Sequence, residues 1–150
     1  MSEATAALRL FALADPDIVE LVGDRIRPSS MHQADILPCV CVTTISSDPD
    51  ESLLGDAGHQ NDRIQFDVFA ATDAGAHRLA RLLRLRWLAA YGILETDIAT
   101  VDDPDPPAIS VTGVSTAGGI RDIPADAPID GSDDWQYRSS FDLFVSFNPS

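Results

Sequence analysis

The segment from residue 63 to residue 92 constrains the fold most, because it joins a clear strand pattern to a clear helix pattern. Apolar and polar residues alternate through RIQFDVFA, which is typical of a strand that buries one face. Thr72 or Asp73 then offers a side-chain oxygen to the free amides of a helix start, and Gly92 can adopt the left-handed conformation that ends a helix. The sequence therefore predicts a strand followed directly by a helix that covers the sheet.

The predicted helix has two different apolar surfaces. One is a stripe at helical spacing that would pack on the sheet, formed by Ala76, Leu79, Ala80, Leu83, Trp87 and Ala90. The second surface consists of leucines among arginines. These residues can be interpreted as ordinary protein surface, since exposed leucines and arginine stems are common. They can also be interpreted as a contact face whose guanidinium groups bind carboxylates of a neighbouring protein subunit. The residues of this candidate interface are Arg78, Arg81, Leu82, Arg84, Leu85 and Leu88.

The charge of the chain is strongly acidic, with 24 acidic residues, 10 basic residues and a formal net charge of -14. Proteins that bind nucleic acid gain affinity by neutralising phosphates with basic side chains, so this balance opposes specific binding to DNA or RNA. It is compatible with an acidic wall that repels phosphates and lets a duplex pass without sticking.

No signature of a metal site or of a catalytic site is present. The four possible zinc ligands lack the spacing of paired ligands, and the acidic stretches lack the twelve-residue calcium pattern. The chain also has no nucleophile elbow and no phosphate-binding glycine loop. We therefore expect no cofactor and no enzymatic activity, although sequence does not reveal whether two carboxylates meet in space. The possible zinc ligands are Cys39, Cys41, His32 and His59.

The order of elements predicts an α+β fold in a single domain over residues 1–150. Neighbouring strands joined by loops pair most simply as antiparallel hairpins. We therefore predict two layers, a mainly antiparallel four-stranded sheet with helices packed on one face. Besides the central unit, the predicted helices are 3–14 and 16–22, and the predicted strands are 24–27, 39–46, 108–116 and 135–147.

The chain between Ser47 and Asp62 is polar and rich in turn-forming residues around an isolated leucine pair. We predict a long exposed hairpin connection here. Its length has two interpretations: an ordinary exposed surface loop, or a segment that becomes ordered on docking to a partner. The residues of this candidate docking loop are Asp50, Leu53, Leu54 and Asp56.

The order and spacing of four segments resemble the tail terminator or tail completion family of long-tailed bacteriophages and gene transfer agents. These segments are ALRLFALADPDIVELVGDRIRP, LPCVCVTTIS, RIQFDVFAATDAGAHRLARLLR and YRSSFDLFVSF. The loops at 47–61, 93–107 and 119–134 match poorly. The resemblance implies a subunit of a hexameric ring that ends polymerisation of the tail tube and meets the head connector. It also implies no enzymatic activity and no cofactor, with DNA passing through the ring.

We therefore expect a structural protein of the virion tail, located at the head–tail junction and assembled in the host cytoplasm. Its expected partners are further copies of itself, the major tail tube protein and a head–tail connector or neck protein. DNA is expected to pass without specific binding, and no membrane contact is expected, since the N-terminus lacks the features of a secretory signal. Two alternatives remain: another neck or head–tail connector protein of the same particle, or an acidic ligand-binding or hydrolytic domain.

Overall fold

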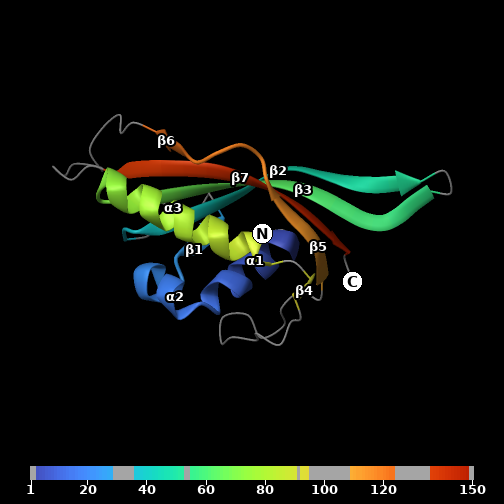
Figure 1. Cartoon of the computed structure of the whole chain (residues 1–150), viewed down its shortest axis with the longest axis horizontal. Helices are drawn as coiled ribbons and strands as arrows, with labels where there is room; N and C mark the ends of the chain where they lie inside the picture. The colour runs from blue at the N-terminus through green and yellow to red at the C-terminus, as the bar shows by residue number, and fades with distance from the viewer. Residues whose placement is uncertain are drawn as a thin grey trace.

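A computed structural model describes residues 3–28, 36–52, 55–90, 92–94, 109–123 and 136–148, and these form three helices and seven strands (Figure 1). The helices are α1 (Glu3–Leu13), α2 (Pro16–Val22) and α3 (Asp73–Leu88). The strands are β1 (Ile26–Pro28), β2 (Cys39–Ser52), β3 (Gly55–Ala70), β4 (Gly92–Leu94), β5 (Ile109–Thr116), β6 (Arg121–Ile123) and β7 (Tyr137–Asn148). The predicted α+β class is confirmed.

All seven strands belong to one mixed sheet in the order β1-β2-β3-β7-β5-β4. β6 follows β5 along the same edge of β7, so the sheet is open and six strands wide. β1 and β2 run parallel, whereas the other pairs among the described residues are antiparallel. The predicted four-stranded antiparallel sheet is therefore not confirmed. Sequence reasoning missed β4 and β6 because three residues are too few to show an alternating pattern.

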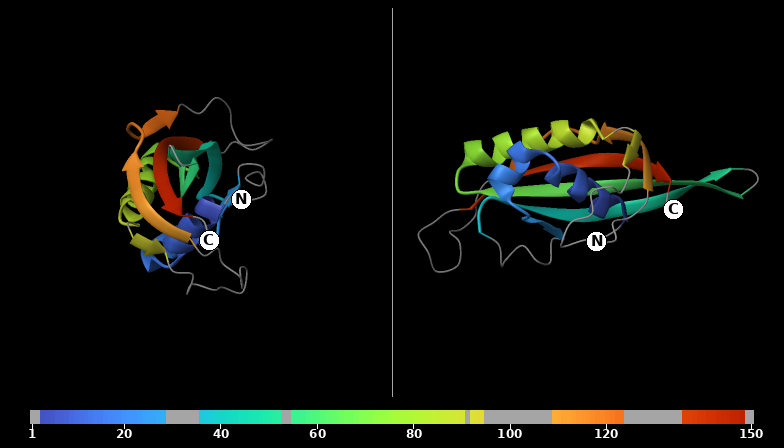
Figure 2. Two further views of the ribbon diagram at one scale, coloured as in Figure 1. Left: turned by 90° about the vertical axis from the view of Figure 1, so that its right-hand side faces the viewer. Right: turned by 90° about the horizontal axis from the view of Figure 1, so that it is seen from below.

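β2 and β3 form a hairpin whose far end projects beyond the rest of the molecule (Figures 1 and 2). Their register continues to Ser52 opposite Gly55, while the pairing of β3 with β7 stops at Gln60. We call residues 49–52 and 55–59 the arm. The predicted hairpin between residues 47 and 62 is present, but its described residues are paired strands and not a loop. Backbone hydrogen bonds hold such a two-stranded ribbon together whatever the polarity of its side chains.

A single hydrophobic core lies between the three helices and one face of the sheet. At its centre the ring of Phe66 stacks on Trp87 and on Phe141, with centroid distances of 4.1 and 5.1 Å. The indole N–H of Trp87 donates a 2.7 Å hydrogen bond to the carbonyl of Leu8, which ties α1 to α3. Every residue of the predicted sheet-facing stripe of α3 is buried, so that prediction is confirmed.

The two ends of α3 differ in how well sequence predicted them. The hydroxyl oxygen of Thr72 accepts the N–H of Gly75 at 3.0 Å, which confirms one of the two predicted caps. A Cβ on Gly75 would lie 2.7 Å from that oxygen, so the cap also requires a glycine there. Gly92 does not end the helix. The last helical residue is Leu88, and the capping residue Ala89 has a right-handed helical backbone conformation. Gly92 instead pairs with Val111 and belongs to the sheet.

Candidate functional site

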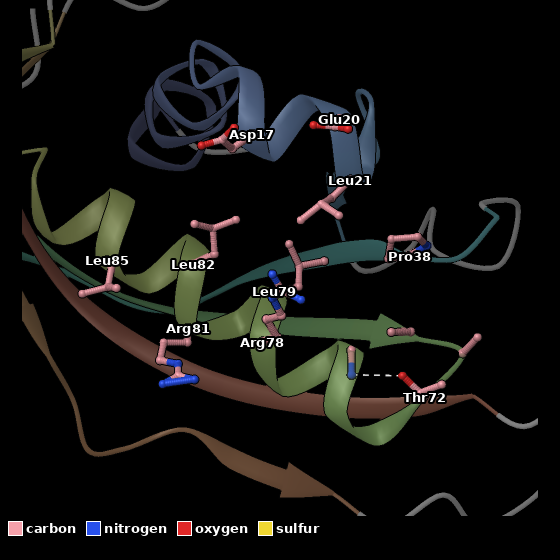
Figure 3. Close-up of a pocket in the computed structure, with 13 residues that line it drawn as sticks. Asp17, Glu20, Leu21, Pro38, Thr72, Arg78, Leu79, Arg81, Leu82 and Leu85 are labelled. Atoms are coloured by element: carbon pink, nitrogen blue, oxygen red, sulfur yellow. Dashed lines mark hydrogen bonds between the residues drawn. The ribbon is translucent and has the colours of Figure 1, made fainter.

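A groove of about 850 Å³ lies between α2 and α3 (Figure 3). Pro38, just before β2, the end of β3 and the turn that follows β3 also contribute to its lining. The residues that line it are Asp17, Glu20, Leu21, Pro38, Ala70, Ala71, Thr72, Gly75, Arg78, Leu79, Arg81, Leu82 and Leu85.

Capping and burial fix the α2 wall of the groove. The carboxylate of Asp15 accepts the backbone N–H of Asp17 at 2.9 Å, and a proline at the first helical position favours the start of the helix. The side chains of Ile18 and Val22 are buried in the core. The opposite side of the helix is therefore left to the groove, and it presents Asp17, Glu20 and Leu21.

The exposed part of the α3 wall is formed by residues outside the buried stripe of this helix. Leu85 is 60% exposed, so most of its apolar side chain is accessible to solvent or to a partner. Arg78 and Arg81 are exposed and make no ion pair or hydrogen bond within the described residues. Leu82 is partly buried against the core and points from α3 toward α2 (Figure 3). This wall therefore combines accessible apolar surface with unpaired positive charge.

The structure brings together four of the six candidate interface residues, because Arg78, Arg81, Leu82 and Leu85 all line the groove. The other two do not line it. Leu88 is partly buried against the core. Arg84 is also partly buried, and its Nε atom is buried without a hydrogen-bond partner within the part of the chain that the structure describes.

The candidate docking loop is not a loop where the structure describes it. Asp50 lies in β2 and Asp56 lies in β3, both near the far end of the hairpin. Leu53 and Leu54 lie outside the described residues. Any docking by this segment would therefore use a hydrogen-bonded ribbon, whose position relative to the sheet is set by the strands that continue into it.

Sequence reasoning missed the α2 side of the groove. Asp17, Glu20 and Leu21 have the spacing of neighbours on one face of a helix, which was the available signal. In a seven-residue helix that spacing carries little weight without the knowledge that α3 lies beside it.

A second polar cluster joins three strands. Oδ2 of Asp142 accepts two hydrogen bonds from Arg63, at 3.0 and 2.8 Å, and its Oδ1 accepts one from Arg121 at 3.0 Å. The Asp142 side chain is only 4% exposed. Both guanidinium groups are thus engaged by one buried carboxylate. We attribute to this cluster the attachment of β6 and β3 to β7, not the binding of a ligand.

A third cluster contains a serine, a histidine and an aspartate, but not in a catalytic order. The carboxylate of Asp122 accepts the hydroxyl of Ser139 at 2.7 Å and lies 2.9 Å from Nδ1 of His77. The Ser139 hydrogen bond, followed by that of His77, lowers the pKa of Asp122 below its usual value. A serine nucleophile needs a base that takes its proton, and here the serine donates to the carboxylate instead of the imidazole.

Other chemistry is not indicated by the described residues. Among them, no three His, Cys, Asp or Glu side chains converge as metal ligands. Cys39 and Cys41 are buried and are not joined in a disulfide. No helix within the described ranges is long and apolar enough to cross a membrane.

Comparison with known proteins adds no family. No family model matches the sequence, and no curated protein is significantly similar to it.

Proposed function

We propose that this protein is a structural subunit of a phage-like tail that forms a ring at the end of the tail tube, hexameric by its family resemblance. The ring ends polymerisation of the tube and joins the tail to the head connector. The proposal assigns no enzymatic activity and no cofactor to the protein. Its location would be the head–tail junction of the virion, after assembly in the host cytoplasm.

The observation that carries this proposal is the outward face of α3. Leu85 is 60% exposed beside Arg78 and Arg81, which have no ion-pair partner in the part of the chain that the structure describes. Exposed apolar side chains next to arginines are typical of protein interfaces, in which arginine is enriched and the centre is apolar. Each chain carries 24 acidic residues, so a neighbouring copy offers many carboxylates to these arginines.

The arm supports the same proposal, because it projects beyond the helices and can reach a second molecule (Figure 2). In the proposed assembly the arm contacts the tail tube protein or the connector.

We also propose that the fold has two layers. The helices form one layer, and the four longest strands, β2, β3, β7 and β5, form the antiparallel centre of the other. The surplus of acidic residues would allow DNA to pass through the ring without binding.

One alternative is another neck or head–tail connector protein of the same particle, which would use the same surface at a different level of the neck. Its position in an imaged particle would separate the two. The clusters around Asp122 and Asp142 give no support to the second alternative, an acidic ligand-binding or hydrolytic domain, since both are satisfied internally.

The test is the substitution Leu85→Asp, which places a charge on the outward face of α3 without touching the core. We expect unchanged circular dichroism and a change in unfolding free energy within about 0.5 kcal/mol. Rings at the ends of purified tail tubes should be lost in negative-stain images, and the tubes should no longer be capped. Ile36→Asp is a matched control, because Ile36 is 71% exposed and lies outside the groove. Normal rings and normal capping by the Leu85→Asp protein would refute the proposal.

A further inference from the structure

The groove between α2 and α3 has one acidic edge and one basic edge (Figure 3). Asp17 and Glu20 stand on α2, whereas Arg78 and Arg81 stand on α3. All four side chains are exposed, and no ion pair joins the two edges within the described residues. The two edges are therefore separate patches of opposite charge that are available to a partner.

Apolar side chains lie between these two edges. Leu21 is 44% exposed and points from α2 toward α3, and Leu82 points back toward α2 (Figure 3). Leu85 stands further along α3 and is the most exposed leucine of the lining. Burial of these side chains would favour association, and the charges on either side would determine how a partner is oriented.

This arrangement of charge is complementary to itself. Rotation of a second copy by half a turn about the long axis of the groove brings its basic edge over the acidic edge of the first copy. The same rotation brings its acidic edge over the basic edge, so each contact occurs twice. We propose that the groove binds the same groove of a second copy in a two-fold pair, with Leu85 of each copy entering the apolar strip of the other.

A partner with charge of one sign fits less well. A nucleic acid, or any other strongly acidic partner, would meet Asp17 and Glu20 as like charges. The same objection applies to the arm of another copy, since the arm contains three acidic residues and no lysine or arginine. The acidic residues are Asp50, Glu51 and Asp56. A second groove is the occupant that matches both edges.

The pair goes beyond the proposed ring and does not depend on it. A two-fold contact is complete with two copies, whereas a ring needs a head-to-tail contact that repeats around an axis. Because the pair covers Leu82 and Leu85, which the proposed ring also uses, free pairs would separate when the ring forms. The contact is therefore a property of the free protein.

The experiment uses charge reversal and rescue in the purified full chain. Sedimentation equilibrium of the wild-type protein should fit a reversible monomer–dimer association. Glu20→Arg or Arg78→Glu alone should raise the dimer dissociation constant by about tenfold or more, because each reversal introduces two repulsive contacts. An equimolar mixture of the two variants should pair normally, since every contact again joins opposite charges. The double variant should pair normally for the same reason.

Asp48→Arg is the control, because it reverses an exposed acidic side chain on the hairpin, away from the groove. Circular dichroism establishes that each variant is folded. The inference is overturned if the wild-type protein stays monomeric at every concentration, if the reversals have no effect, or if the mixture does not pair. Growth beyond two copies that depends on these charges would show a head-to-tail contact and also overturn it.

Tube capping is measured separately and tests only the proposed function. A pair with the expected charge dependence but no capping would contradict the tail proposal alone. Normal capping by a protein that never pairs would contradict the two-fold contact alone.

Discussion

Replacement of Trp87 by phenylalanine should loosen α1 from α3, the helix that forms one wall of the groove. The indole ring is fully buried, stacks on Phe66 at a centroid distance of 4.1 Å and donates a 2.7 Å hydrogen bond to the carbonyl of Leu8. A phenyl ring can keep the stacking contact. It cannot donate the hydrogen bond, and it leaves part of the indole volume empty.

Two losses set the expected size of the effect. Loss of a buried hydrogen-bond partner costs about 1–3 kcal/mol. Here we expect about 1 kcal/mol, because the Leu8 carbonyl lies in a helix and keeps its intrahelical donor. Complete truncation of a buried aromatic residue costs about 3–5 kcal/mol, so loss of one of the two fused rings should cost about 1–2 kcal/mol. The sum is about 2–3 kcal/mol, which for a domain of this size lowers the melting temperature by about 5–10 °C.

The measurement is urea unfolding followed by far-ultraviolet circular dichroism, with Leu85→Ala as the control. Leu85 is also a large apolar residue of α3 but is 60% exposed, so its truncation should change the free energy of unfolding by less than about 0.5 kcal/mol. Equal effects of the two substitutions would refute the role assigned to Trp87. A Trp87→Phe protein as stable as the wild type would do the same.

Two further predictions concern buried carboxylates. Asp142→Asn should lower the free energy of unfolding by about 2 kcal/mol in urea titrations, less than for a fully buried pair because Arg63 and Arg121 are about half exposed and regain water; a loss below about 0.5 kcal/mol would contradict this account. Burial raises the pKa of Asp62 above the ordinary aspartate value of 3.8, against the lowering effect of the Ser47 hydrogen bond. The folded state then holds this proton more tightly than the unfolded state, so the stability contributed by this group falls as pH rises from 3.8 through the raised pKa. Asp62→Asn should therefore gain stability relative to the wild type at pH 7 and lose that advantage in acid; parallel pH profiles of the two proteins would argue against it.

Features encoded by short-range patterns could be predicted from the sequence. The buried stripe of α3 follows from helical spacing, and the Thr72 cap follows from one side-chain oxygen placed before the helix. The α2 helix was predicted with its correct limits, because Asp15 and the following proline mark its start and Gly23 its end. Each of these patterns lies within a few residues of the chain, so no knowledge of the fold was needed.

Features that depend on pairing between distant segments could not be predicted. The polarity of residues 47–62 predicts a hairpin connection without strands, whereas the partner strand decides whether a polar segment is extended. Likewise Asp142 meets Arg63 and Arg121 only because β3, β7 and β6 are neighbours in the sheet. The strand order that brings them together leaves no periodic trace in the sequence.

The two walls of the groove show the same difference between local patterns and long-range packing. By itself the sequence determined that α3 carries leucines and arginines outside its core stripe, because a helical repeat fixes which residues share a face. Only the tertiary structure decided that α2 lies alongside and supplies the acidic edge formed by Asp17 and Glu20. The physical reason is that the position of α2 is set by the burial of Ile18 and Val22 in the shared core, a long-range packing choice that no local pattern contains.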